Sequence, residues 1–233
     1  VWGAINGNWF GIDSAVLPSF LQVLILPPFR MQPDLDPILA NKMLQQNIKH
    51  LCFIIGVVQL SLAHLKNIKK LFPSLVMFSQ IGWLSLVIGL YYLVLNLVLD
   101  RTAFPVPDFS LWMIGGGLGL YFIFAEQKGG NFFVNIGKGF ANFLPTFLSA
   151  VSSFSDIISY IRLFAVGLAG LSIAQSVNSM ALAMPEGLVR ILAGSLILVF
   201  GHGLNLAMNA LSVMVHGIRL NMLEYSGHLG MEW

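Results

Sequence analysis

The sequence predicts an all-α membrane protein with about six membrane segments, of which the last two are long and steeply tilted. Of its 233 residues, 57% are hydrophobic and 9% are charged, whereas a soluble globular domain carries roughly 25% charged residues. Apolar runs of the ~20 residues that a spanning helix needs follow one another along the chain. A net charge of +2, with no basic run longer than Lys69-Lys70, argues against a nucleic-acid partner.

Residues 1–142 are predicted to form supporting transmembrane helices. Val1–Leu17 is interpreted as the tail of one span, and residues 18–46 as an extended, Pro-rich extramembrane loop with five prolines. Three more spans are expected, at Asn47–Leu65, Ser74–Leu99 and the shorter Leu111–Ala125. A linker at 126–142, with two lysines among aromatic residues and glycines, fits an amphipathic segment in the membrane interface.

The shorter span contains three adjacent glycines, Gly115, Gly116 and Gly117. Such a cluster in a membrane helix indicates a close helix contact or a bend. A phosphate-binding loop is excluded, because no strand precedes the glycines and no Lys-Ser/Thr pair follows them.

The last two segments are Phe143–Met180 and Gly187–Tyr225. At 1.5 Å per residue, ~38 residues give ~57 Å of helix, against a hydrocarbon core of ~30 Å. These helices must therefore tilt steeply, project from the membrane, or both.

The orientation follows from the lysines. Alternating spans place the connections at 66–70 and 126–142 on one face together with the C-terminus, and these connections carry five lysines. Since Lys and Arg near span ends favour the cytoplasmic side, the C-terminus is predicted to be cytoplasmic.

Arg162 is the only charged residue in the apolar run from Ile157 to Met184. An arginine in hydrocarbon costs at least ~2.5–3.5 kcal/mol on insertion scales, and its guanidinium stays protonated in proteins. A permanent positive charge at this place needs a negatively charged or hydrogen-bonding partner. Binding that partner is usually the reason why the arginine is there.

The last long helix carries six polar or ionisable residues on one side. Stepping 100° per residue places them within one stripe of ~100°. They are His202, Asn205, Asn209, Ser212, His216 and Arg219. Hydrogen bonds between helices explain one such residue, whereas a stripe with two histidines and an arginine favours a hydrated ion path.

The helix before it shows a similar grouping around Arg162, formed by Ser152, Ser155, Asp156 and Ser159. Asp156 is open to three interpretations: an internal partner of Arg162, a carboxylate at a helix end, or a group that steers cations. Glu224 is interpreted either as a carboxylate that gathers cations at one mouth of the path or as a solvated charge at a helix end. Residues 143–233 are thus predicted to be a two-helix ion-path unit.

Two motifs carry a resemblance to a known family. Ser155–Ala169 (SDIISYIRLFAVGLA) resembles the penultimate helix of the membrane subunit of V/A-type rotary ATPases, called subunit a or subunit I, and His216–Tyr225 (HGIRLNMLEY) resembles its last helix. Trp2-Gly3 and Phe10-Gly11 are similar to an earlier segment of that family. The resemblance, and a start without an initiator methionine, imply a C-terminal fragment of a longer chain.

The resemblance implies an ion-translocating stator subunit that forms two half-channels against a ring of proteolipid (c/K) subunits. Arg162 would match the family's essential arginine and Arg219 its second arginine. It also implies a peripheral stalk and a cytoplasmic ATPase sector as partners through the missing N-terminal region, and a bacterial plasma membrane as location. Gly170 and Asn209 depart from the eukaryotic vacuolar pattern, which has His and Glu at these positions, whereas His216 is retained.

No nucleotide-binding motif is visible, so we expect no catalytic centre, cofactor or metal in this chain. H⁺ and Na⁺ are both open as the ion. The main alternative is a secondary transporter with an intramembrane, Arg-based anion site. That class predicts inverted repeats and matched broken helices, and the sequence shows no internal repeat. A purely structural anchor would leave both arginines without a role.

Overall fold

The computed structural model describes residues 11, 18, 21, 37–99, 101, 104–125, 127, 137, 139 and 141–230. These residues form helices and no strand, which confirms the predicted all-α class. The chain divides into two compact units. The first comprises Val1–Lys49 and Arg162–Gly217, and the second comprises His50–Ile161 and Ile218–Trp233.

Among the described residues, four helical stretches are long and apolar enough to cross a membrane. They are Lys42–Leu71, Met77–Val98, Phe143–Leu182 with 40 residues, and Leu188–His228 with 41 residues. A shorter apolar helix, Asp108–Phe124, matches the predicted short span. The predicted span Val1–Leu17 lies outside the described residues apart from Gly11, and so does most of the predicted linker at 126–142.

The helix α3 (Pro37–Leu71) begins earlier than predicted. Residues 37–46 were expected to belong to the extended loop, and the structure instead makes them helical. The reason is local, because proline is favoured in the first helical position and the following leucine, alanine, methionine and glutamines are good helix formers. The prolines before it and the polar Asn41, Lys42, Gln45 and Gln46 concealed the helix from a search for apolar runs.

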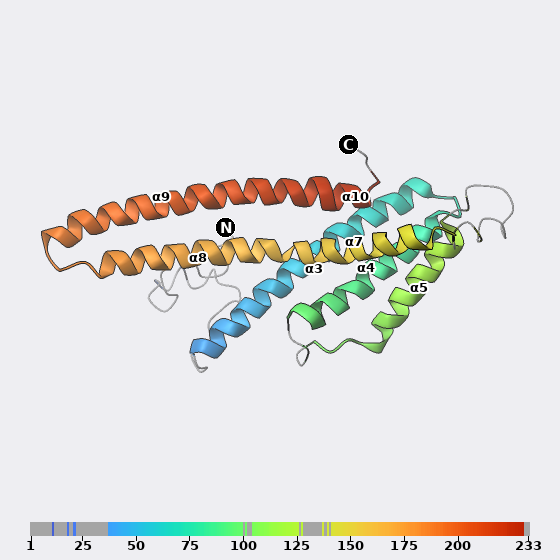
Figure 1. Ribbon diagram of the computed structural model, residues 1–233, viewed down its shortest axis with the longest axis horizontal. Helices are drawn as coiled ribbons and strands as arrows, with labels where there is room; N and C mark the ends of the chain where they lie inside the picture. Colours follow the sequence, from blue (N-terminus) through green and yellow to red (C-terminus); the bar gives the residue numbers. More distant parts are fainter. Residues whose placement is uncertain are drawn as a thin grey trace. The chain divides into compact units, whose positions relative to one another are not determined.

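In the second unit, α4 (Met77–Val98) and α5 (Asp108–Phe124) form a close antiparallel pair (Figure 1). The approach depends on two facing glycines. A Cβ atom built on Gly117 would lie 2.5 Å from the Gly82 carbonyl oxygen, and one on Gly82 would lie 2.6 Å from the Gly117 oxygen. The predicted glycine contact is thus confirmed at Gly117, whereas a Cβ at Gly115 or Gly116 would meet open space.

The core of the second unit joins α3 and α4 to α7 (Phe143–Ser159). Its fully buried members include Phe53 from α3, Leu86 and Val87 from α4, and Ile157 from α7. Tyr160, which follows α7, is also fully buried. This core fixes the part of α7 that carries Asp156.

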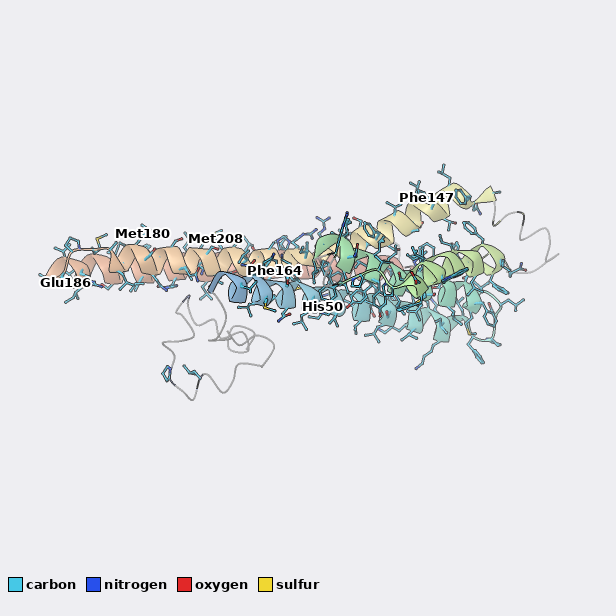
Figure 2. The ribbon with its side chains drawn as sticks, turned by 90° about the horizontal axis from the view of Figure 1, so that it is seen from below. His50, Phe147, Phe164, Met180, Glu186 and Met208 are labelled. Carbon is cyan, nitrogen blue, oxygen red and sulfur yellow. The ribbon has the colours of Figure 1, made fainter. Side chains whose placement is uncertain are left out.

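In the first unit, α8 (Ile161–Leu182) and α9 (Leu188–Arg219) run antiparallel (Figure 1). Gly201 lets α9 approach α8, because a Cβ there would lie 2.5 Å from the Val177 side chain. Figure 2 shows Glu186 at the connected end of this hairpin and the exposed Met180 and Met208 along it. Most apolar side chains of α9 are exposed in the chain alone, as expected for a helix that faces lipid or a partner.

Candidate functional site: a polar cavity in the second unit

The last long helix changes its winding at Arg219. α9 ends there, and a π-helical turn, η3 (Leu220–Tyr225), follows. Hydrogen bonds in a π-helix join residues i and i+5, so positions five apart come to lie near one another. Arg219 Nε accordingly lies 3.7 Å from Glu224 Oε1. The Glu224 side chain is 4% exposed and that of Arg219 is 53% exposed.

Two contacts with α3 hold this turn in place. Gln59 Nε2 donates a hydrogen bond to Asn221 Oδ1 at 2.8 Å, and Lys66 Nζ donates one to the Tyr225 hydroxyl at 2.8 Å. The Lys66 ammonium also lies 5.4 Å from the centre of the Tyr225 ring, within the range of a cation–π interaction. The turn is therefore fastened at both ends of its short length.

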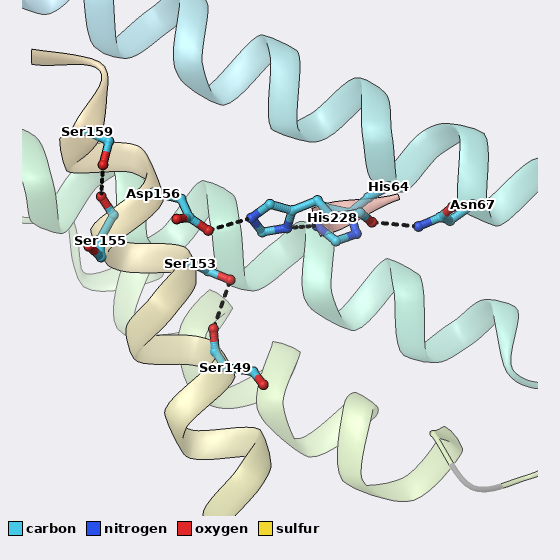
Figure 3. Close-up of polar contacts among 8 residues, drawn as sticks. All are labelled: His64, Asn67, Ser149, Ser153, Ser155, Asp156, Ser159 and His228. Atoms are coloured by element: carbon cyan, nitrogen blue, oxygen red, sulfur yellow. Dashed lines mark hydrogen bonds and ion pairs between the residues drawn. The ribbon is translucent and has the colours of Figure 1, made fainter. Parts of the chain in front are cut away.

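Serines of α7 provide a polar face. Ser153 Oγ donates to the Ser149 carbonyl oxygen and Ser159 Oγ donates to that of Ser155, both at 3.0 Å (Figure 3). Bonds to a carbonyl four residues earlier satisfy the hydroxyl proton inside the helix. The oxygen lone pairs stay available to water or to an ion.

These groups surround a cavity of about 610 Å³ in the second unit. Six of the residues predicted for the ion path line it together. They are Ser152, Ser155, Asp156, Ser159, Arg219 and Glu224. Glu224 is buried, so its interpretation as a solvated charge at a helix end is wrong.

The cavity also contains residues that the sequence analysis missed. The most important are His64, Gln80 and His228, which form one chain of hydrogen bonds with Asp156 (Figure 3 shows all but Gln80). Asn67 Nδ2 donates to the His228 carbonyl oxygen at 2.8 Å and fixes that residue. An imidazole in the middle of an apolar helix was the available signal for His64, but its partner is 164 positions away in the chain.

The first unit holds a second group of predicted residues, along the line where α8 and α9 meet. His202 Nε2 lies 2.9 Å from Asn178 Oδ1, and Asn205 Nδ2 donates to the Gly170 carbonyl oxygen at 2.9 Å. Asn209 Nδ2 donates to the Asn205 carbonyl and side-chain oxygens at 2.8 and 2.7 Å. We call His202, Asn205, Asn209, Asn178 and Gly170 the amide seam.

The two departures from the vacuolar pattern are in contact within this seam. A Cβ atom on Gly170 would lie 2.6 Å from Asn209 Nδ2. Asn209 therefore occupies the space that the missing side chain leaves. Both positions carry neutral groups, and neither can exchange a proton at ordinary pH.

Arg162, Ser212 and His216 also lie in the first unit and are half-buried. Arg162 Nη1 and His216 Nδ1 are buried, and neither has a hydrogen-bond partner among the residues that the structure describes. A buried guanidinium nitrogen without a partner is costly. Within the same described ranges, no three His, Cys, Asp or Glu residues are arranged to hold a metal ion.

The long apolar helices and the ionisable cavity define a polytopic, helical integral membrane protein. Over its full length, the chain is 46% identical to V-type ATP synthase subunit I of Borreliella burgdorferi. It is 38% identical, again over its full length, to V-type ATP synthase subunit I 1 of Treponema pallidum. Over 64% of its length it is 31% identical to A-type ATP synthase subunit I of Pyrococcus horikoshii. No protein-family model and no solved structure matches it.

The chain is therefore a homologue of the V-type and A-type ATP synthase subunits named I, as its two arginine motifs predict. It spans 38% and 36% of the lengths of the first two relatives.

Proposed function

We propose that this chain is the ion-translocating part of a stator subunit in a V/A-type rotary ATPase or ATP synthase. It would form two half-channels against a ring of proteolipid subunits, with Arg162 between them. The names of its homologues support membership of such a complex. The observation that carries the role of Arg162 is its buried Nη1, which has no hydrogen-bond partner within the described part of the chain, since a partner on another subunit would satisfy it.

The physical reason for the arginine is electrostatic. A ring carboxylate can face lipid only when an ion neutralises it, and a nearby positive charge favours its ionised form. At ~4 Å the attraction between two unit charges is about 4 kcal/mol at an effective dielectric of 20. A carboxylate that reaches Arg162 would therefore release its ion, and a loaded one would lose that stabilisation.

We assign one half-channel to the cavity of the second unit. Its lining combines serine hydroxyls with Asp156, Arg219 and Glu224, which suits a hydrated path through an apolar bundle. His64, near the lysine-rich end of α3, and His228, near the C-terminus, both line it. This end was predicted to be cytoplasmic, so the cavity would open to the cytoplasm.

The other half-channel is assigned to Ser212 and His216 of α9, which supply a hydroxyl and an ionisable group. Residues 143–233 would then face the ring, with the exposed apolar side chains of α9 in contact with the ring or with lipid. The stalk and the ATPase sector would bind parts of the longer protein beyond this chain.

The test is Arg162→Ala in the full-length subunit, assembled in the complex and reconstituted into liposomes. We expect ATP-driven ion uptake to fall more than ~100-fold, because the attraction that unloads the ring is lost. Arg190→Ala is the matched control, since Arg190 forms a surface ion pair with Glu186 at 3.5 Å. Uptake near the control level in an intact complex would reject the proposed function.

A further inference from the structure

A continuous chain of hydrogen bonds crosses the cavity and joins four helical elements. The Gln80 side-chain oxygen on α4 lies 3.0 Å from His64 Nδ1 on α3. His64 Nε2 lies 3.0 Å from His228 Nδ1 on α10 (Ser226–His228), and His228 Nε2 lies 3.1 Å from Asp156 Oδ2 on α7. His64 is 3% exposed and the His228 side chain is 7% exposed, so protein groups fix both rings.

The number of protons that these hydrogen bonds need shows which protonation states the two histidines can adopt. Asp156 accepts from His228 Nε2, and the Gln80 oxygen accepts from His64 Nδ1, so both outer nitrogens carry protons. If both imidazoles were neutral, the two inner nitrogens, His64 Nε2 and His228 Nδ1, would each point a lone pair at the other across 3.0 Å. The arrangement is satisfied when one additional proton lies between His64 Nε2 and His228 Nδ1.

The same chain also suits the neutral pair. If the Gln80 amide turns over, its NH₂ group donates to His64 Nδ1, and His64 Nε2 donates to His228 Nδ1. Every nitrogen is then satisfied without an additional proton. The pair can therefore gain and lose one proton with a rotation of one amide and no movement of the helices.

We propose that His64 and His228 share one exchangeable proton and act as a proton station in this cavity, so that the ion carried here is H⁺. The inference rests on the proposed function and deepens it by naming the ion and two further residues of the path. Uptake breaks one O–H bond of a hydronium ion in the cavity water and forms one N–H bond at His64 Nδ1. Release breaks one N–H bond and forms one O–H bond to water.

The charged groups around the pair fit this role. Asp156 lies against His228 and balances the additional positive charge. Arg219 and Glu224, which also line the cavity, are 3.7 Å apart and largely offset one another. Lys66 on α3 is bonded to the Tyr225 hydroxyl, and the lining residue of α5 is the neutral Tyr121. Asp156 is thus the carboxylate that balances a positive charge on the His64–His228 pair.

The experiment uses the full complex in liposomes with His64→Gln and His228→Gln, singly and together. We expect each single variant to lower ATP-driven proton uptake about tenfold or more, as the loss of a proton-transfer group does, and the double variant to add little because both belong to one station. His50→Gln is the matched control, since His50 lies on the same helix, bonds the Tyr91 hydroxyl at 3.0 Å and is absent from the cavity lining.

Chemical rescue separates proton transfer from a structural role. In His228→Ala, imidazole added to the medium should enter the space left by the ring and restore uptake, because it supplies the missing nitrogen base. The same imidazole should leave the wild-type complex and His50→Gln unchanged. Uptake equal to the His50→Gln control in both single variants, or no rescue by imidazole, would overturn the proton station.

The outcome also distinguishes this inference from the proposed function. If Arg162→Ala abolishes uptake and the histidine variants transport normally, the station is wrong and the proposed function stands. If the wild-type complex moves ²²Na⁺ and no protons, the station is wrong as well. If Arg162→Ala transports normally, the proposed function fails whatever the histidine variants do.

Discussion

The cavity of the second unit and the amide seam of the first unit use polar residues in opposite ways. In the seam, amides donate to oxygen acceptors on the same hairpin, as Asn205 does to Gly170 and Asn209 does to Asn205. In the cavity, carboxylates, imidazoles and a guanidinium face open space. Under the proposed function, the amides that satisfy one another in the seam stabilise the fold, whereas the ionisable groups beside the cavity serve transport.

Among the tests of this comparison, the largest effect on ion uptake is expected at Glu224, and its absence would contradict the comparison. Glu224→Gln removes the charge of a buried carboxylate beside the cavity at nearly constant volume. We expect ion uptake to fall about tenfold or more, because the change leaves the Arg219 charge unbalanced in the lining, and a lining charge of one sign changes the local concentration of ions by such factors. The effect should weaken as ionic strength rises. Initial rates of uptake at two salt concentrations measure both expectations.

Glu186→Gln provides the control for Glu224, since it changes a side chain that is 93% exposed and paired with Arg190. Its uptake should match that of the wild-type complex, because surface ion pairs contribute about 0–1 kcal/mol. Equal uptake by the two variants would mean that the Glu224 charge has no part in transport.

The amide seam should show the reverse behaviour. Asn205→Leu removes the bond to the Gly170 carbonyl oxygen and the side-chain acceptor of Asn209, which keeps the backbone oxygen of residue 205. We expect it to lower the free energy of unfolding by about 1–2 kcal/mol, the value of an interhelical hydrogen bond in a membrane, with ion uptake per assembled complex nearly unchanged. Thermal unfolding of the complex in detergent and uptake in liposomes give the two quantities. If Asn205→Leu lowered ion uptake without lowering stability, the amide seam would be part of the ion path.

The sequence predicted much of the fold because length and polarity are local properties. Phe143–Leu182 and Leu188–His228 follow from two long apolar runs, and helical stepping placed Ser152, Ser155 and Ser159 on one side of α7. Helical stepping does not predict the pairing of Glu224 with Arg219, because an α-helix would turn the two about 140° apart. The π-helical turn brings the two within 3.7 Å, and the contacts of Asn221 and Tyr225 with α3 that fasten this turn are remote in sequence.

The smallest effect is expected at Ser159, which sharpens the comparison because it lines the cavity without carrying charge. Its hydroxyl already donates to the Ser155 carbonyl oxygen at 3.0 Å, so Ser159→Ala leaves no donor on a neighbouring group unsatisfied. We expect a change in stability within about 0.5 kcal/mol, as for ordinary surface substitutions, and a slight reduction of uptake from the lost oxygen. Ser159→Leu, which fills part of the cavity with an apolar side chain, should reduce uptake clearly. If both variants transported like the wild-type complex, the serine face of α7 would be no part of the path, and the cavity's role would be confined to its ionisable residues.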